Sequence, residues 1–411
     1  MTAGDDVVVV GGGVQGVVTA LHLRESGVSR VRLLERHGLL EATSGAGAGF
    51  VAIWAAMTAR PYGEEELAVE RYGLGFYRAL HERGHDIDFR QNGLLLVGAD
   101  DEAFEQFRAV RRERFDPDTA VVDAERIEEL TGGAVLAAGV RGGVFQPAAA
   151  QVFTPKVGTA LAARAREAGI TVERGRPATG LEVRRGRVTG VRTQTGTVAS
   201  GAVVLAAGAW SNQLLRPHGA RLPQVPHVTS RAITEPLGVP RTMPALMLSG
   251  VIEGGPRLWV REHQGGLLWG VVQRTYPRHM LIGREELPLR LDAIPLDGVQ
   301  EAERVARAVS RVMPALSRYR RLALAHGAPC FTPDHRALVG PVPGIDGLYA
   351  IAGDNEAGVT HGPGFAKVLA DHIVRGSSEL TDLEGWRIDR FGERYVTEAE
   401  VAEGVELAAA G

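Results

Sequence analysis

The sequence predicts an α/β (α+β) fold that combines a parallel sheet with a mainly antiparallel one. The runs Val7–Val10 and Ala202–Leu205 are apolar throughout, which is typical of strands buried on both faces of a parallel sheet. Between residues 223 and 325 the pattern changes to alternating strands, which indicates an antiparallel sheet with one face toward a cavity. With 411 residues, the chain exceeds one ordinary hydrophobic core, so two domains are expected.

The overall composition is that of a soluble globular protein. The net charge of -3 argues against a nucleic-acid partner. Cys330 is the only cysteine, so neither an internal disulfide nor a cysteine metal cluster can form, and no metal site is predicted. The segment Met1–Asp6 has no basic region, and no apolar run reaches membrane-spanning length. We therefore expect a cytoplasmic protein without membrane attachment.

The first strand leads into a glycine-rich turn with a recognisable spacing. Glycines at 11, 13 and 16 form G-x-G-x-x-G before a helical pattern, and a second strand ends at Glu35. The first glycine allows the tight turn, the second lets a pyrophosphate approach the helix N-terminus, and the third lets helix and strand pack closely. The acid is placed to accept hydrogen bonds from ribose hydroxyls. This unit predicts a Rossmann-like dinucleotide site that uses Gly11, Gly13, Val14, Gln15, Gly16, Glu35 and Arg36.

The next stretch, Glu41–Gly49, is too small and polar for a core element. Its exposed N–H groups and the hydroxyls of Thr43 and Ser44 suit a second phosphate-side loop. A flexible linker is the alternative.

The chain then alternates between helices and strands up to residue 222. We expect helices at 64–83, 101–114, 123–130 and 154–168, the last with Pro155 in its first turn. Strands are expected at 89–97, 139–147 and in short runs from 170 to 200. The strand Ala202–Leu205 ends in small residues, which allow close approach to the first strand.

The second half predicts the antiparallel sheet and then a return to the first domain. Strands are expected at 228–235, 246–252, 258–262, 267–273 and 280–284, followed by a helix at 298–313. After a strand at 348–353, Gly362-Pro363 is expected to open a helix that reaches Val374. This order predicts an interleaved arrangement: residues 1–85, 149–222 and 326–411 in the cofactor domain, and 86–148 and 223–325 in the substrate domain.

Four separated motifs resemble the D-amino-acid oxidase superfamily of flavoproteins. They are Gly11–Glu35, Val203–Ser211, Thr332–His335 with Gly340-Pro341, and Tyr349–Pro363 with its helix. The branch that the chain resembles includes glycine oxidase, sarcosine oxidase, and the sarcosine and dimethylglycine dehydrogenases. The resemblance implies a Rossmann-like FAD-binding domain interleaved with an antiparallel-sheet substrate domain. It also implies FAD as the cofactor and oxidation of a C–N bond beside a carboxylate or similar group.

The same resemblance assigns cofactor contacts beyond the first turn. Ala178 would lie beside the adenine, and Gly208 and Trp210 would lie near the diphosphate. The loop Gly353–Thr360 would run beside the isoalloxazine, with contacts from Gly353, Ala357, Gly358, Val359 and Thr360. The helix after Pro363 would aim its N-terminus at the flavin N1–C2=O edge and stabilise the anionic reduced flavin.

Several positions depart from these relatives. No histidine lies between His37 and His81, and Cys330 is closer to Thr332 than in relatives with a cysteine link, so the FAD is expected to be non-covalent. The only lysines, Lys156 and Lys367, fall on expected cofactor-domain helices rather than over the flavin. The electron acceptor, O2 or another, is therefore left open.

The substrate side departs further. By the same resemblance, glycine oxidases place the arginine that clamps the substrate carboxylate where Pro329 stands, and another arginine of the flavin loop where Glu356 stands. A carboxylate at 356 favours a substrate with a cationic or hydrogen-bond-donating group. The resemblance suggests His361 and Glu356 as catalytic residues, and Trp259, Arg261, Trp269 and Glu356 as substrate-binding residues. The alternatives are a solvated loop acid, a helix-start histidine and tryptophans that only pack in the core.

The favoured function is therefore an FAD-dependent amine or amino-acid oxidase or dehydrogenase. Hydride would pass from the α-carbon of a small-molecule amine to flavin N5, and the imine would then hydrolyse. Gly353-Asp354 also resembles a motif of flavin monooxygenases, which gives an NADPH-dependent hydroxylase as an alternative. A third possibility is an FAD-binding subunit of a larger oxidoreductase assembly. The sequence does not predict the oligomeric state.

Overall fold

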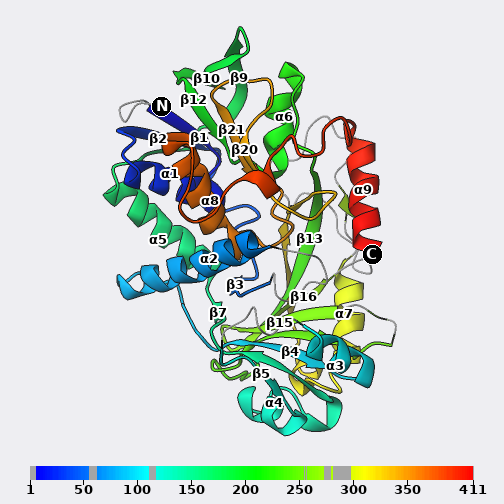
Figure 1. Ribbon diagram of the computed structural model, residues 1–411. Helices are drawn as coiled ribbons and strands as arrows, with labels where there is room; N and C mark the ends of the chain where they lie inside the picture. Colours follow the sequence, from blue (N-terminus) through cyan, green and yellow to red (C-terminus); the bar gives the residue numbers. More distant parts are fainter. Residues whose placement is uncertain are drawn as a thin grey trace.

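The computed structural model describes residues 6–54, 63–110, 117–253, 255, 257–272, 279–280 and 298–410. One unit is built on a sheet with the strand order β20-β21-β12-β1-β2-β8 (Figure 1). Neighbouring strands are parallel except β20 and β21. The bounds are β1 (Asp6–Val10), β2 (Arg30–Glu35), β8 (Thr171–Arg174), β12 (Ala202–Leu205), β20 (Leu338–Pro341) and β21 (Leu348–Ala352).

The valines of β1 explain why this strand is apolar on both sides. Val7 and Val9 join a core with helices α1 (Val14–Glu25), α5 (Thr154–Glu167) and α8 (Gly358–Arg375). Val8 and Val10 join a second core on the opposite face. That core includes the small sheet of β9 (Ala178–Arg184), β10 (Arg187–Thr193) and β11 (Gly196–Ala199), together with α6 (Ser211–Leu215).

The other unit is built on a large sheet with the order β17-β13-β16-β15-β14-β4-β6-β5, and β18 and β19 also pair with β13. Its pairs are antiparallel except β14 and β4. Figure 1 shows β13 as a long strand between the two units. The bounds are β4 (Leu94–Gly98), β5 (Ala120–Val122), β6 (Gly142–Gln146), β13 (Val225–Thr234), β14 (Ala245–Ser249), β15 (Arg257–His263), β16 (Gly266–Val272), β17 (His279–Met280), β18 (Leu322–Gly327) and β19 (Cys330–Phe331). The predicted combination of a parallel-centred sheet with a largely antiparallel one is confirmed.

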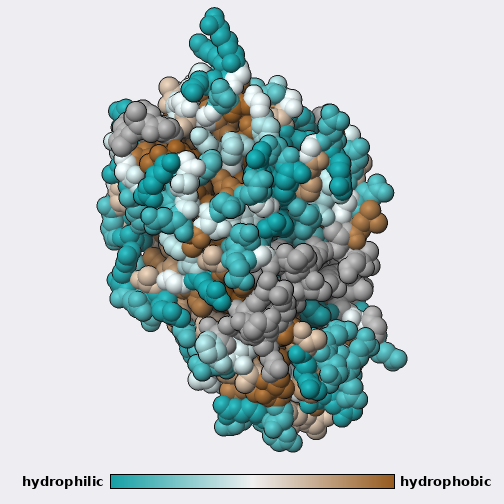
Figure 2. All heavy atoms as spheres, viewed as in Figure 1, coloured by the Kyte–Doolittle hydropathy of each residue, from teal (hydrophilic) through white to brown (hydrophobic). Residues whose placement is uncertain are grey.

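The remaining elements connect and cover the sheets. They are β3 (Phe50–Val51) paired with β7 (Ala150–Gln151), helices α2 (Glu64–Glu82), α3 (Asp101–Arg108), α4 (Ala124–Leu130), α7 (Gly298–Val309) and α9 (Glu398–Ala410), and the 3-10 turns η2 (Ala137–Gly139), η3 (Gly208–Trp210), η4 (Arg216–His218), η6 (Pro314–Ser317) and η7 (Glu384–Trp386). The face seen in Figure 2 is largely hydrophilic, including the protruding tip of the β9–β10 hairpin. Among the helices of the described ranges, none combines the length and apolar character that a bilayer-spanning helix needs.

Helix α8 differs from the prediction, because it begins at Gly358 and contains Pro363 in its interior. Proline has no N–H to donate to the carbonyl four residues earlier, which here belongs to Val359. The buried Tyr77 hydroxyl of α2 donates to that carbonyl instead, at 2.8 Å. The tertiary contact therefore replaces the helical hydrogen bond. Residues 281–284 of one predicted strand, and 111–114 of one predicted helix, lie outside the described residues.

Candidate functional site

The glycine-rich turn after β1 is shaped by close backbone contacts. Gly11 has φ of +112°, and a Cβ there would lie 2.3 Å from the Ala206 carbonyl oxygen. A Cβ on Gly16 would lie 2.0 Å from the Gly11 carbonyl oxygen. These glycines let β1, α1 and β12 approach one another. By contrast, a Cβ on Gly13 would meet only the Ser44 hydroxyl, at 3.2 Å, so the backbone of Gly13 is accessible from a cavity.

This cavity has a volume of about 220 Å³ and extends from the turn after β1 to the ends of β12 and β21. Twelve of the residues predicted to bind the cofactor line it: Gly11, Gly13, Val14, Gln15, Glu35, Arg36, Thr43, Ser44, Ala178, Gly208, Trp210 and Gly353. Gly16 lies behind the turn. The predicted contacts from Ala357 to Thr360 are not part of this lining.

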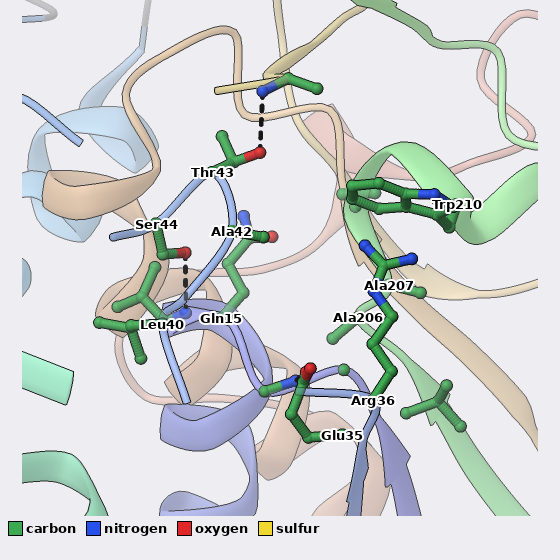
Figure 3. A pocket seen from close by; sticks show the side chains of 18 of the residues that line it. Gln15, Glu35, Arg36, Leu40, Ala42, Thr43, Ser44, Ala206, Ala207 and Trp210 are labelled. Carbon is green, nitrogen blue, oxygen red and sulfur yellow. Dashed lines mark hydrogen bonds between the residues drawn. The ribbon is translucent and has the colours of Figure 1, made fainter. Parts of the chain in front are cut away.

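One end of the cavity is formed by an acid, a base and an aromatic ring. Glu35 accepts hydrogen bonds from the N–H groups of Gly12 at 2.6 Å and His37 at 2.7 Å. The Arg36 guanidinium stacks on the Trp210 ring, 3.6 Å from its centroid (Figure 3). Burial lowers the pKa of Arg36, while Glu35 opposes this shift. The pair presents a flat surface next to a fixed carboxylate, a combination that suits an adenosine.

The loop with Thr43 and Ser44 is anchored rather than a free linker. The Ser44 hydroxyl accepts from the Val14 N–H at 3.1 Å, and the Thr43 hydroxyl accepts from the Ala328 N–H at 2.9 Å (Figure 3). Thr154 at the start of α5 donates to the Gly45 carbonyl at 2.7 Å. The loop is thus tied to α1, α5 and the segment before β19.

The other end of the cavity is formed by the loop between β21 and α8. Gly353, Asn355 and Glu356 all have positive φ, +64°, +51° and +74°, which is costly for the two residues that are not glycine. The Asn355 side chain holds the turn by accepting from the Thr332 N–H at 3.0 Å and donating to the Gly353 carbonyl at 2.6 Å. The chain therefore maintains a strained loop at the end of the cavity.

Two titratable groups that sequence reasoning did not select line this end, Asp354 and Cys330. Burial raises the pKa of Asp354 to about 6, although the positive charge of His361 opposes the shift. Burial, reinforced by Asp354, raises the pKa of the Cys330 thiol. The sequence feature that could have identified these two residues is their position beside the motifs at 332–335 and 353. Among the described residues, no group of three or more His, Cys, Asp or Glu side chains is placed to hold a metal ion.

The two residues predicted to be catalytic lie on the same loop and helix but in different surroundings. His361 Nε2 is 2.7 Å from Glu70 Oε1 of α2, and Glu70 is buried. Glu356 is exposed. Its charge raises the pKa of Arg231, against a larger lowering by burial. Asp354 is within electrostatic reach of both His361 and Glu356, so the loop gathers these three groups.

Three of the residues predicted to bind substrate, Trp259, Arg261 and Trp269, divide between the two faces of the large sheet. Trp269 pairs with Val260 and Ala232 and is buried in a core with α7. Trp259 and Arg261 face the other way, because side chains alternate along a strand. We therefore do not propose Trp269 as a substrate contact. The aromatic side chain of Trp269 suggested that it lines a cavity, but the register of the strands turns it toward the core with α7.

On the opposite face, Trp259 packs edge-on against Phe50, with ring centroids 5.6 Å apart. Arg261 is buried and donates to the Val152 carbonyl at 3.1 Å, and burial lowers the pKa of Arg261 to about 10. A third residue on this face, Arg231, was missed by sequence reasoning. The sequence feature that could have identified it is that Arg231 is the one arginine in the otherwise mostly uncharged strand β13.

The model of the "FAD dependent oxidoreductase" (DAO) family matches residues 6–372 of the chain. The glycine oxidase of Pseudomonas aeruginosa is 30% identical over 384 residues, which cover 92% of this chain and 96% of that protein. The structure of L-proline dehydrogenase from P. horikoshii is similar with a TM-score of 0.79 and 21% identity, over 94% of this chain and 97% of that one.

Other relatives are much longer than this chain. Rat mitochondrial dimethylglycine dehydrogenase is 26% identical over 425 residues, which cover 97% of this chain but 46% of that protein. For the mouse pyruvate dehydrogenase phosphatase regulatory subunit the identity is 26% over 397 residues, covering 94% of this chain and 43% of the relative. The chain thus spans less than half the length of these relatives. The match along most of its sequence shows that the chain belongs to the DAO family of FAD-dependent oxidoreductases.

Proposed function

We propose that this chain binds FAD without a covalent link and oxidises the C–N bond of a small amine or amino acid. The observation that carries the proposal is the single cavity lined by both the Gly11–Gln15 turn and the Gly353-Asp354 loop. The N–H groups at the start of α1 suit a diphosphate, and Glu35 suits a ribose. The donor set therefore fits FAD, whose adenosine would be held at the end with Glu35 and Arg36 and whose flavin would lie at the end with Asp354.

When bound, FAD supplies the chemistry by accepting a hydride at N5 from the substrate α-carbon. The amine lone pair becomes the C=N bond of an iminium ion, the protonated imine, which water hydrolyses to a carbonyl compound and a protonated amine. The chain must hold the amine in its neutral form over the flavin. Glu356 and His361 remain the proposed catalytic residues. Glu356 would attract a cationic or donating group of the substrate, while His361 is oriented by the contact between its Nε2 and Glu70.

Non-covalent attachment is supported by the state of the nearby thiol. A thioether link requires a nucleophilic thiolate, but burial raises the pKa of Cys330, which disfavours the thiolate. The segment from Gly38 to Trp54 contains no histidine. The early loop therefore offers no imidazole for a link either.

Anaerobic addition of a panel of amines and amino acids tests the proposed reaction, with NADPH added to a separate sample. The proposal expects at least one amine to bleach the visible flavin absorbance, while NADPH leaves it unchanged. Bleaching by NADPH alone would instead identify a hydroxylase-type reductive step. A flavin that responds to none of these compounds would favour an FAD-binding subunit of a larger assembly.

A further inference from the structure

Asp354 is an acidic residue at the end of the cavity to which the proposed reaction assigns no role. It is half-buried and lines the cavity together with Gly353 and Cys330. Burial raises its pKa to about 6, although the positive charge of His361 opposes this shift. The carboxylate is thus near the point where an additional charge beside it decides whether it holds a proton.

The carboxylate of Asp354 lies against the first residue of α8. A Cβ on Gly358 would lie 2.0 Å from Asp354 Oδ2, so a glycine there makes room for the acid. A backbone hydrogen bond from Glu356 favours the charged carboxylate, as does the positive end of the helix dipole. The side chain of Asn355 holds the turn by donating to the Gly353 carbonyl at 2.6 Å. The fold therefore fixes an ionisable group between the cavity and the start of α8.

The other titratable groups near Asp354 come from several elements. Besides burial, which has the larger effect, His361 of α8 lowers the pKa of Asp354 and the charge of Glu356 raises it. His361 Nε2 is also 2.7 Å from Glu70 of α2, so the imidazole serves two acids. On the side of β19, burial and then the charge of Asp354 raise the pKa of the Cys330 thiol. These surroundings disfavour a further negative charge at this end of the cavity.

Reduction of the flavin places such a charge there. In the reaction proposed above, FAD takes up a hydride, which carries two electrons and one proton, and the reduced flavin then bears one negative charge. Adjacent negative charges in an enclosed site raise the pKa of one of the groups that bear them, so their titrations are coupled. We propose that Asp354 takes up one proton when the bound flavin is reduced. This inference rests on the FAD position in the proposed function, and the proton uptake keeps the net charge of this end of the cavity constant.

The same proton balances the proposed amine oxidation. A protonated substrate amine must lose one proton from nitrogen before its α-carbon gives up the hydride. The two losses leave an iminium ion, a reduced flavin and one proton, and Asp354 accepts one proton in exchange. No co-reactant besides the amine and FAD is needed.

The test measures the midpoint potential of the FAD-bound protein at several pH values between about 6.5 and 8. A chemical reductant is used with reference dyes, and no amine is present. Wild type is compared with Asp354→Asn, which cannot take up a proton, and with Asp354→Glu, which retains a carboxylate. Asp346→Asn is the matched control, because Asp346 lies at an exposed position just before the same strand, β21.

The expected result is a difference in the slope of midpoint potential against pH. One proton taken up with two electrons changes the reduction equilibrium tenfold per pH unit, which corresponds to about 30 mV, and two protons give about 59 mV. Wild type should follow the larger slope and Asp354→Asn the smaller one, while Asp354→Glu and Asp346→Asn should resemble wild type. Below about pH 6, where Asp354 is protonated before reduction, the wild-type slope should fall toward that of the asparagine variant.

Equal slopes in wild type and Asp354→Asn would overturn the inference. If both are large, the second proton belongs to the flavin itself, and if both are small, no second proton is taken up. A loss of FAD affinity in Asp354→Asn with an unchanged slope would likewise leave Asp354 with a binding role only.

A second measurement decides the question if the asparagine variant does not retain FAD. The infrared difference spectrum of wild type on reduction should gain the C=O stretch of a protonated carboxyl group, displaced in Asp354→Glu. Its absence would contradict proton uptake at Asp354. A flavin that shows the larger slope but that no amine reduces would count against the proposed reaction alone.

Discussion

At Glu356, an unfavourable backbone conformation and an exposed carboxylate coincide. Its φ of +74° is held by the Asn355 turn, and its charge reaches the buried Arg231. Such strain persists where the surrounding structure fixes it, which is common at binding sites. We therefore propose that Glu356 lies at the entrance to the substrate site, where it would attract the positively charged end of the substrate.

The variant Glu356→Gln tests this role with a nearly isosteric neutral side chain. KM for the natural amine should rise by about 5- to 30-fold, since one charge pairing is lost, while the FAD content stays the same. Steady-state kinetics and the ratio of flavin to protein absorbance measure the two quantities. An unchanged KM would show that Glu356 is only a solvated loop acid.

Asp354 should make the stability of the flavin-free protein depend on pH. Its pKa in the folded protein is raised to about 6 by burial, from an ordinary value of 3.8. Between these values the folded state retains a proton that the unfolded state has released, so the free energy of unfolding falls as the pH rises. Ionisation of Asp354 should lower the free energy of unfolding by about 1–3 kcal/mol in total, and this loss should be complete above about pH 6.

Urea unfolding of the wild type and Asp354→Asn at several pH values between about 4 and 7 measures this loss. The asparagine cannot ionise. The free energy of unfolding of Asp354→Asn should therefore rise relative to that of the wild type as the pH rises. A difference that stays constant over this range would mean that Asp354 is not buried in a way that disfavours its charge.

Residues in the first turn could be predicted from sequence because their roles depend on local spacing. Gly11 and Gly16 have the close contacts that the spacing requires. Arg231 and Trp269 could not be predicted, because the face that each occupies depends on which strands pair and in what register. That pairing is between segments far apart in the chain, and a shift by one residue would exchange the two faces.

At the scale of elements, the crossing of α2 and α8 sets the position of the loop at the end of the cavity. A Cβ on Gly73 would lie 1.9 Å from the Thr360 carbonyl oxygen, and one on Gly364 would lie 2.6 Å from the Val69 carbonyl oxygen. The two helices thus meet backbone to backbone. This contact also carries Tyr77 to the Val359 carbonyl and Glu70 to His361.

Alanine substitutions at two glycines of α2 distinguish the effect of losing the contact with α8 from the effect of alanine on helix propensity. Gly73→Ala should lower the free energy of unfolding by about 1–3 kcal/mol, since backbone must move to admit the methyl group. It should also weaken FAD retention through displacement of Thr360. Gly75→Ala is the control, because no atom lies within 4 Å of its Cβ position, and it should be neutral or stabilising by up to about 1 kcal/mol. Equal effects of both variants in thermal unfolding and FAD titration would contradict the packing role of Gly73.

Most elements could be predicted because periodicity and capping residues are local features. Helix α5 begins with Thr154 and Pro155 as expected, and Asp100 and Asp123 cap α3 and α4. The start of α8 could not be predicted, because proline normally marks the first turn of a helix. An interior proline is accommodated there because the distant Tyr77 hydroxyl donates to the Val359 carbonyl that the proline leaves without its helical partner.

At the scale of the whole molecule, both units contribute to the region between them. Segments 10–44, 177–178, 206–214, 328–330 and 352–354 contribute residues to the cavity lining, while Trp259 of the large sheet packs against Phe50 of the other unit. The order of motifs along the chain predicts an interleaving of the two domains, since cofactor-type motifs reappear only where the chain would return to the same domain. The residues that meet between the units could not be read from that order.

The intact protein should release all of its flavin when it is precipitated with acid. The reasons are the raised pKa of the buried Cys330 thiol and the absence of histidine from Gly38 to Trp54. Absorbance of the supernatant and the washed pellet measures the distribution. Yellow colour that stays with the denatured pellet would reveal a covalent bond.

Anaerobic reduction of the bound flavin by the most reactive amino acid from the panel tests directly whether this protein oxidises a C–N bond. The rate is measured by stopped-flow absorbance with the normal substrate and with the same substrate deuterated at the α-carbon. The account predicts bleaching of the flavin in a single turnover and slower bleaching with the deuterated substrate, because the α-C–H bond breaks in that step. A flavin that no amine or amino acid reduces, but that NADPH does, would contradict it.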